Sequence, residues 1–332
     1  YIQDRTKIKL IIDFGSKVRV FKDSSINTAI MILEKCNDKE ERDKNQIKVV
    51  KISDWDKDIT SLIQHIKLHI NENICSDKHI SIFNVPQKKL NPRLWILLPK
   101  EIESIISRIE RTGKPLGELF DVYKGIDTGL DKVSKIHIKK ATDENIVFQP
   151  PLQEKEEVFV VSEETIQKKK LEKDLLRPLL KNRNVRRYYF EHDGRYIVMT
   201  TDDVDISKYP NIEKHLQRYK PLLERRHFLR DAPWYTLRYL GGLKTLMSKK
   251  DRLMTPYIAP ENRFALIKGE DGYICTTDMY YIVPKDDCKI NLKYVLGILN
   301  SKLMNFYHRN TAKAVDGKAR TSYGIMRRRF QY

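Results

Sequence analysis

Residues 297–310 read GILNSKLMNFYHRN, and this stretch predicts the helical element that closes the fold. Leu296, Leu299 and Leu303 recur at the spacing that places side chains on one face of a helix. Asn300 lies off that face, and aromatic rings and hydrogen-bond donors follow it. Taken alone, the pattern is typical of a buried amphipathic helix, so its meaning depends on the sequence that precedes it.

The composition predicts a folded, basic protein of about two domains. Hydrophobic residues make up 40% of the 332 residues, and the apolar runs are too short to cross a bilayer, so we expect no membrane span. Lys and Arg number 63 against 45 Asp and Glu. The net charge of +18 favours a polyanionic partner, with nucleic acid ahead of an anionic membrane surface.

The cysteines indicate the compartment. The four cysteines form no C-x-x-C pair, and this spacing excludes a zinc ribbon. They are also too sparse for a disulfide scaffold (Cys36, Cys75, Cys275 and Cys288). We therefore expect a cytoplasmic protein. The chain starts without Met and without a signal-peptide pattern, and we expect it to be a fragment of a longer polypeptide.

The first 85 residues alternate between apolar runs and polar segments, as in an α/β fold. The run over 28–33 is almost continuously apolar, which is typical of a strand covered on both faces. A polar, proline-bearing connector over 82–93 predicts a domain boundary. The expected elements are strands over 8–12, 28–33 and 49–52, a solvated loop or hairpin over 37–47, and a helix over 57–72.

After residue 94 the pattern changes to short strands and turns between helices. Pro99 stands at a position that favours the start of a helix. Residues 186–190 and 195–200 predict a hairpin around His192-Asp193-Gly194. Helices are expected over 102–109, 163–176, 212–228 and 292–303, and strands over 158–161, 253–258, 264–267, 273–275 and 280–283.

Several short motifs occur in a fixed order along this part of the chain. They are WILLP (95–99), YKGIDTG (123–129), LLKNRNVRRY (179–188), MTPY (254–257), NRFA (262–265) and LNSKL (299–303). Together they resemble the TaqI-like C-terminal specificity domain of adenine-specific DNA methyltransferases and type IIG restriction-modification enzymes. The resemblance covers residues 94–312.

The N-terminal part supports this resemblance, because residues 11–15 (IIDFG) and 27–35 (NTAIMILEK) are similar to the last strands of the methyltransferase sheet in that family. The implied fold is α/β: the end of a Rossmann-like methyltransferase sheet, followed by a mixed α+β target recognition domain. The implied domains are the C-terminal part of the methyltransferase domain at 1–85, the DNA target recognition domain at 94–312 and a basic C-terminal segment at 313–332.

The resemblance implies sequence-specific recognition of double-stranded DNA. The glycine-rich cofactor motif and the catalytic Asn-Pro-Pro-Tyr motif of such enzymes are absent, and Asn91-Pro92 is followed by no aromatic residue that would stack on a flipped adenine. We therefore expect no cofactor and no catalytic residue in this chain. The implied partner is the rest of the methyltransferase polypeptide, with S-adenosylmethionine as its cofactor. The sequence leaves open whether that polypeptide also carries a nuclease.

The candidate DNA contacts combine a glycine loop, basic clusters and exposed rings. An arginine fork can donate two hydrogen bonds to a guanine edge, and lysines bind phosphates. In the loop over 125–129, Gly125 and Gly129 either form a tight turn or let the backbone approach the DNA closely, and the sequence leaves both interpretations open. The candidates are Lys124, Gly125, Asp127, Thr128, Arg183, Arg186, Arg187, Tyr188, Arg225, Arg226, Trp234, Tyr235, Arg238, Asn300, Arg309 and Lys313.

Two other functions stay open at this point. One is a divergent nuclease with an unrecognised site, and the other is a general basic module that binds RNA or a membrane surface. His65 and His69 have a spacing that can hold zinc, but without further ligands a solvated helix face is the favoured interpretation. We accordingly predict no metal site.

Overall fold

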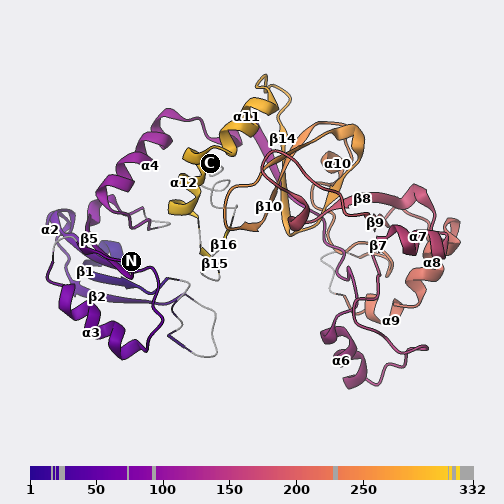
Figure 1. Cartoon of the computed structure of the whole chain (residues 1–332), viewed down its shortest axis with the longest axis horizontal. Coiled ribbons are helices and arrows are strands. Elements are labelled where there is room, and N and C mark those ends of the chain that lie inside the picture. Colours follow the sequence, from indigo (N-terminus) through magenta and orange to yellow (C-terminus); the bar gives the residue numbers. More distant parts are fainter. Residues whose placement is uncertain are drawn as a thin grey trace. The chain divides into compact units, whose positions relative to one another are not determined.

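The computed structural model describes residues 1–15, 18, 20–21, 27–72, 75–91, 95–226, 231–312, 314–315 and 319–321. Contacts divide the chain into two compact units (Figure 1). Unit 1 comprises residues 1–115 and 306–328, and unit 2 comprises residues 116–305 and 329–332. The mixture of helices and sheets confirms the α/β class. The functional boundaries expected from the sequence stay predictions.

A five-stranded sheet forms the centre of unit 1, in the order β2-β1-β3-β5-β4. Strands β1 and β3 are parallel, and the other neighbouring pairs are antiparallel. The strands are β1 (Thr6–Asp13), β2 (Ala29–Lys35), β3 (Gln46–Ile52), β4 (Cys75–Ser76) and β5 (Ile80–Pro86). The helices are α1 (Ile2–Arg5), α2 (Lys39–Lys44), α3 (Ile59–His69) and α4 (Lys100–Thr112).

Apolar side chains alternate between the two faces of this sheet, because successive residues of a strand point to opposite sides. Helix α3 lies beside one face of the sheet (Figure 1), and its Leu62 and Ile66 share a core cluster with Val50. Val49 and Phe83 belong to a separate cluster. Asp58 caps the N-terminus of helix α3, and its carboxylate accepts a hydrogen bond from the backbone N–H of Ser61 at 2.9 Å.

Three expectations for the N-terminal part were wrong. Strand β2 is an edge strand exposed along its whole length, so neither face of its apolar run is covered. Residues 37–47 contain helix α2, because the Asp38 side chain accepts from the backbone N–H groups of Glu40 and Glu41. The expected connector at 82–93 contains most of β5, which pairs with both β3 and β4 and buries Phe83 and Val85.

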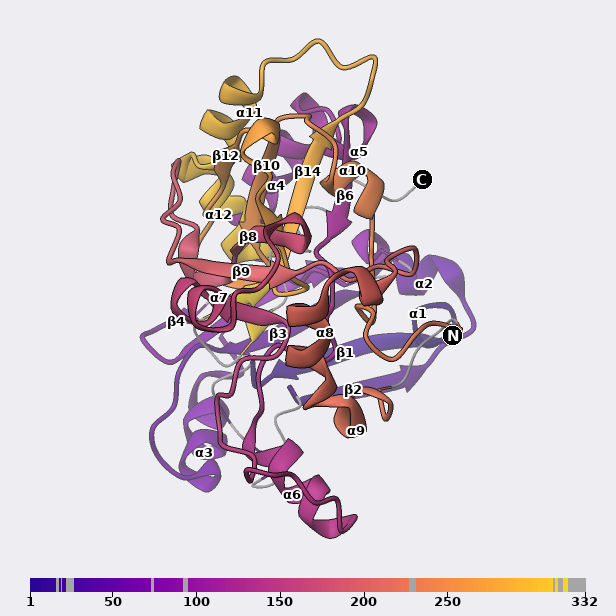
Figure 2. The ribbon, with the colours of Figure 1, turned by 90° about the vertical axis from the view of Figure 1, so that its right-hand side faces the viewer.

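Unit 2 contains two four-stranded sheets over one continuous core (Figure 2). The first has the order β12-β10-β14-β6 and is antiparallel throughout. The second has the order β13-β8-β9-β7, with only the β13–β8 pair parallel. The strands are β6 (Phe120–Lys124), β7 (Val160–Ser162), β8 (Leu176–Leu180), β9 (Arg195–Val198), β10 (Arg252–Pro256), β12 (Ala265–Ile267), β13 (Ile274–Cys275) and β14 (Met279–Pro284).

Short helices surround these sheets. They are α5 (Leu116–Leu119), α6 (Lys135–Asp143), α7 (Glu163–Lys169), α8 (Pro210–Gln217), α9 (Lys220–Leu223), α10 (Leu243–Leu246) and α11 (Leu292–Leu299). The remaining elements are α12 (Lys302–Thr311) and the short strands β11 (Ile258–Ala259), β15 (Ala314–Val315) and β16 (Ala319–Thr321). Among the residues that the structure describes, no helix is both long and apolar enough to cross a membrane.

The stretch 297–310 forms two helices rather than one. Helix α11 ends at Leu299 and α12 starts at Lys302, so the helical register changes between them. Leu299 is buried as expected, but Leu303 is 54% exposed and Asn300 is 1% exposed. The Asn300 amide accepts from the backbone N–H of Phe264 at 3.0 Å and donates to its carbonyl at 2.9 Å, which fixes the break between the helices.

Residues 186–190 form a tight turn and not the first strand of a hairpin. The backbone N–H of Arg186 donates to the carbonyl of Tyr189 at 2.9 Å, and Val185 pairs with Phe190. Tyr188 has a φ of 76°, which a strand does not allow. The partners of β9 are instead β8 and β7.

Candidate nucleic-acid interface

The glycine loop, residues 124–131, follows β6 and is held by backbone hydrogen bonds on both sides. Ile126 N–H donates to the Cys275 carbonyl at 3.0 Å, and Asp127 exchanges two bonds with Tyr239, at 2.8 and 2.9 Å. A Cβ atom on Gly125 would lie 2.3 Å from the Thr276 carbonyl oxygen. This approach requires glycine, so the geometry supports the structural reading for Gly125.

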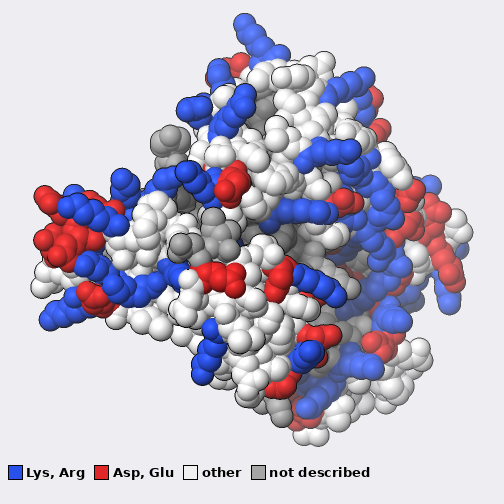
Figure 3. Space-filling model, turned by 60° about the vertical axis from the view of Figure 1, so that its left-hand side comes forward, with Lys and Arg blue, Asp and Glu red and all other residues white. Residues whose placement is uncertain are grey.

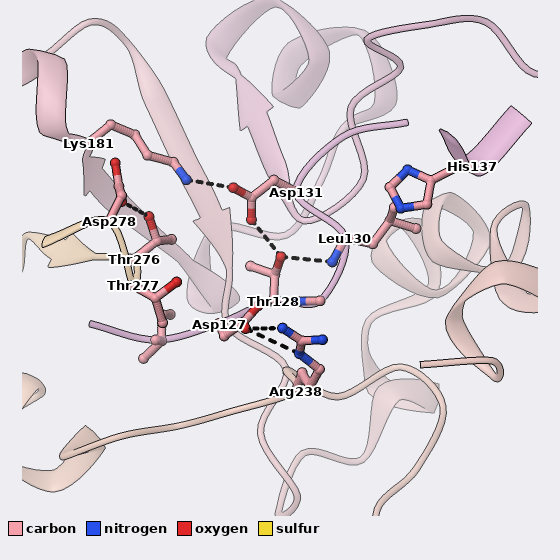
Figure 4. A pocket seen from close by; sticks show the side chains of 12 residues that line it. Asp127, Thr128, Leu130, Asp131, His137, Lys181, Arg238, Thr276, Thr277 and Asp278 are labelled. Carbon is pink, nitrogen blue, oxygen red and sulfur yellow. Dashed lines mark hydrogen bonds and ion pairs between the residues drawn. The ribbon is translucent and has the colours of Figure 1, made fainter. Parts of the chain in front are cut away.

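Side chains of the loop are held by hydrogen bonds and an ion pair. The Thr128 hydroxyl donates to Asp131 at 2.5 Å and accepts from the Leu130 N–H at 3.0 Å. Lys181 donates to the other oxygen of Asp131 at 2.5 Å, as Figure 4 shows. Thr128 is 1% exposed and therefore stabilises the loop from inside.

Arg238 reaches the loop from the opposite wall and pairs with Asp127 through two guanidinium nitrogens (Figure 4). Asp127 also accepts from the Gly129 N–H at 2.8 Å. The Arg238 side chain is 43% exposed, so one side of the guanidinium stays in contact with solvent.

Two neighbouring pockets lie beside the glycine loop. The first, of about 360 Å³, carries three carboxylates and two cations and does not favour an anion (its charged residues are Asp127, Asp131, Asp278, Lys181 and Arg238). The second, of about 520 Å³, carries four cations and one carboxylate, and it favours an anionic group such as phosphate. We call it the cationic pocket, and its charged residues are Lys140, Glu144, Arg225, Arg226 and Arg238.

Arg225 and Arg226 are adjacent in sequence but have different roles in this pocket. Arg226 donates to the backbone carbonyls of Leu223 (3.0 Å), Thr128 (2.5 Å) and Trp234 (2.5 Å), and it thereby joins three segments. Arg225 pairs with Glu144 at 2.5 Å and is 49% exposed. Arg226 is therefore structural, whereas Arg225 presents charge to solvent.

His137 lines both pockets. Its burial, and then the positive charge of Lys140, lower its pKa below the usual value of 6.5. The ring is therefore predominantly neutral at pH 7, and it adds hydrogen-bonding capacity to the cationic pocket without adding charge.

A second basic group is the arginine turn, residues 183–191. Arg183 makes two hydrogen bonds to Asp193, at 2.9 and 2.6 Å, and Arg186 lies 3.7 Å from the Glu191 carboxylate. Arg187 donates to the Asn300 carbonyl, and its guanidinium carbon lies 5.6 Å from the centre of the Tyr188 ring.

The other predicted contacts are dispersed. Trp234 and Tyr235 pack against the core of unit 2. Lys124 is exposed, with its ammonium 5.2 Å from the Tyr257 ring, and Arg309 is exposed on α12. The buried amide of Asn300 binds Phe264, and Lys313 lies outside the described residues.

Sequence reasoning missed several residues of this surface. Lys140 and Lys181 line the pockets, and Tyr189 and Tyr239 are 54% and 46% exposed. Lys181 stands inside the quoted motif 179–188, which was the signal available for it. Nothing in the sequence distinguishes Lys140 from other surface lysines. In the view of Figure 3, many Lys and Arg side chains lie on the visible surface, with Asp and Glu among them.

Comparison with known proteins confirms the resemblance found in the sequence. Residues 177–323 match the family model of the TaqI-like C-terminal specificity domain. The chain is 30% identical over 162 residues to the type II methyltransferase M.MjaIV of Methanocaldococcus jannaschii, an alignment covering 46% of this chain and 53% of the relative. The chain thus spans about half the length of this curated relative.

A solved structure shares the fold. The type IIL restriction-modification enzyme MmeI, determined in complex with DNA, matches 97% of this chain and 35% of its own, with a TM-score of 0.51 and 13% sequence identity. At this level of identity the likeness concerns the fold.

Proposed function

We propose that this chain is the DNA-reading part of a DNA methyltransferase or restriction-modification enzyme, and that unit 2 binds duplex DNA. The match of residues 177–323 to a specificity domain carries this proposal, because it includes the arginine turn and all three arginines of the cationic pocket. One relative is a methyltransferase, and the structural neighbour was determined with DNA bound. A net charge of +18 fits a polyanionic partner.

The exposed arginines are suited to exchange a carboxylate for a phosphate. Arg183, Arg186, Arg225 and Arg238 each face an acidic side chain and are 40–59% exposed. Ion pairs this exposed contribute only about 0–1 kcal/mol, so DNA phosphates can displace the acidic partners at little cost. In the absence of DNA, the acidic partners keep the guanidinium groups ordered.

We assign base reading to the arginine turn and phosphate binding to the cationic pocket. Arg183 and Arg186 lie on a tight turn beside exposed tyrosine rings, and an arginine fork fits a guanine edge in the major groove. Tyr188 holds a positive φ that is uncommon for a non-glycine residue, and such strained positions concentrate at functional sites. In the cationic pocket, Arg225, Arg238 and Lys140 would bind the backbone and set the register.

The parent enzyme is proposed to be adenine-specific and to use S-adenosylmethionine bound by residues outside this sequence. The resemblance to adenine-specific enzymes supports the specificity, and the methyltransferase relative supports the cofactor. Within this sequence the cofactor and Asn-Pro-Pro-Tyr motifs do not occur. The chain's own role would be to position the DNA for that chemistry.

Strand β2 is the proposed contact with the rest of the methyltransferase polypeptide. Its residues Ile30, Met31, Ile32 and Leu33 are 47%, 43%, 51% and 39% exposed, and its outer edge has no neighbouring strand among the described residues. A long apolar edge strand is a site for pairing with a further strand.

Binding of duplex DNA tests the proposed function. We expect fluorescence anisotropy to show binding whose affinity falls with salt at a log–log slope of roughly −0.9 per phosphate neutralised. Matched RNA and anionic vesicles should compete poorly. Equal competition by either would support the general basic module instead, and Mg²⁺-dependent cleavage of plasmid by this chain alone would support the nuclease.

A further inference from the structure

A group of metal-ligating side chains lies in unit 1, outside the candidate DNA interface. His65, His69 and Asp77 each offer a ligand atom, and the three atoms lie within 4.8 Å of one another. The histidines are one turn apart on α3, so both rings project from the same face. The helical spacing alone supplies only two ligands, and the fold adds the third from the turn before β5.

The backbone holds Asp77 in place for this role. One carboxylate oxygen accepts hydrogen bonds from the backbone N–H groups of His79 at 2.6 Å and Ile80 at 2.7 Å. The other oxygen lies 2.7 Å from Nε2 of His65. Asp77 therefore keeps one oxygen for the fold and directs the other towards the histidines.

His69 is oriented by a second carboxylate. Its Nδ1 lies 2.7 Å from Oε1 of Glu72, an arrangement that leaves Nε2 as the ligand nitrogen and that accompanies histidine ligands in metal sites. The His65 ring packs against Trp55, with 5.2 Å between ring centres. The three ligand side chains are 24–33% exposed, so they are partly ordered by packing and still open to an ion.

We propose that His65, His69 and Asp77 form a zinc-binding site, with Glu72 positioning His69. Two imidazoles and one carboxylate form a ligand set typical of zinc, with water in the fourth position. Ligand atoms around tetrahedral zinc lie about 3.4 Å apart, given metal–ligand bonds of about 2.1 Å. Small side-chain rotations suffice to reach this spacing, and zinc replaces the direct His65–Asp77 hydrogen bond.

Bound zinc links the end of α3 to the β4–β5 hairpin and stabilises unit 1. Cys75 forms a neighbouring group with His69 and Glu72, also within 4.8 Å. We assign the ion to the first group because the backbone hydrogen bonds to Asp77 hold one of its ligands in place. The inference concerns unit 1 and does not depend on the proposed DNA binding.

Equilibrium dialysis of the tag-free, chelator-treated chain against Zn²⁺, with the metal measured by mass spectrometry, tests the site. We expect one zinc per wild-type chain, and at least a roughly tenfold weaker affinity in Asp77→Asn and in His69→Gln. Asp77→Asn keeps the oxygen that accepts the backbone N–H groups, so the turn is preserved. His137→Gln, in unit 2, is the matched control and should bind as the wild type does.

Thermal unfolding gives an independent readout, because a ligand that binds only the folded state raises the melting temperature with its concentration. Zinc should raise Tm of the wild type and of His137→Gln, but not of His65→Gln/His69→Gln. Circular dichroism in the absence of metal confirms that each variant is folded. Equal zinc binding by wild type and the double variant, or no zinc retained by the wild type at micromolar concentrations, would overturn the proposal.

Discussion

At the scale of single residues, side chains of one type have separate roles in this protein. Arg226 joins three backbone carbonyls, whereas Arg186 faces solvent beside a carboxylate. Sequence reasoning placed both in one group, because residue type does not distinguish a guanidinium that holds three carbonyls from one that pairs with a carboxylate and stays 40% exposed. The fold shows that the first positions the glycine loop through the Thr128 carbonyl, whereas the second remains partly exposed.

Arg186→Ala should weaken specific DNA binding by about 1–3 kcal/mol, or relax the preference at one base pair, because the fork that reads a guanine is removed. Anisotropy titrations with the preferred duplex and its single-base variants measure this. Arg111→Ala removes the same charge from an exposed position of α4 and should leave the preference unchanged. Unaltered affinity and preference in Arg186→Ala would show that this residue does not contact DNA.

Gly125→Ala should destabilise unit 2 by about 1–3 kcal/mol, since the new Cβ would overlap the backbone at Thr276. Gly297→Ala is the matched control, because nothing lies within 4 Å of its Cβ position in α11. That change should be neutral or stabilising by up to about 1 kcal/mol, through helix propensity. Urea unfolding compares the two, and equal stability of both variants would contradict the close approach.

At the scale of elements, periodicity predicted where most helices and strands lie, but not what covers them. Helix α3 and strands β1 and β3 lie where their apolar patterns place them. The run in β2 was read as buried on both faces, since a pattern cannot show that a strand is at an edge. Residues 186–190 of the arginine turn were predicted to be a strand, because a tyrosine in the sequence does not indicate the positive φ that Tyr188 adopts.

The exposed β2 edge should make the isolated chain self-associate. Ile32→Lys places a charge in the middle of the strand, where it opposes edge-to-edge pairing. We expect sedimentation velocity to show fewer oligomers for this variant than for the wild type. Leu68→Lys, at a position on α3 that is 78% exposed, should not change the distribution. A wild type that is monomeric at all concentrations would show that β2 does not mediate self-association.

At the scale of the whole molecule, stability should depend on pH through a buried histidine that lines neither candidate pocket. His215 is 4% exposed, with Nε2 2.8 Å from the Val158 carbonyl and Nδ1 2.7 Å from the Lys169 ammonium. Burial, and then the charge of Lys169, lower the pKa of His215 to about 4. The neutral ring donates through Nε2 and accepts through Nδ1. Protonation would make Nδ1 a donor as well, and its N–H would then face the Lys169 ammonium.

Because the folded pKa of His215 lies below its usual value of 6.5, the unfolded chain binds this proton first as pH falls. The folded state should therefore lose about 3 kcal/mol between pH 6.5 and 4. Urea unfolding at pH 7, 6 and 5 measures the slope, and His215→Gln should flatten it. Above pH 4.5 the carboxylate of Glu157 contributes little to this loss, because its lowered pKa of about 2 affects stability at lower pH.

If unit 2 is the DNA-reading part proposed above, this chain should distinguish base sequences in duplex DNA. Selection from a random duplex library by the purified chain, followed by sequencing of the bound fraction, measures this. We predict enrichment of one short motif, with Arg186→Ala losing the preference at a base pair that Arg111→Ala retains. A bound fraction whose sequences match those of the input library would contradict it.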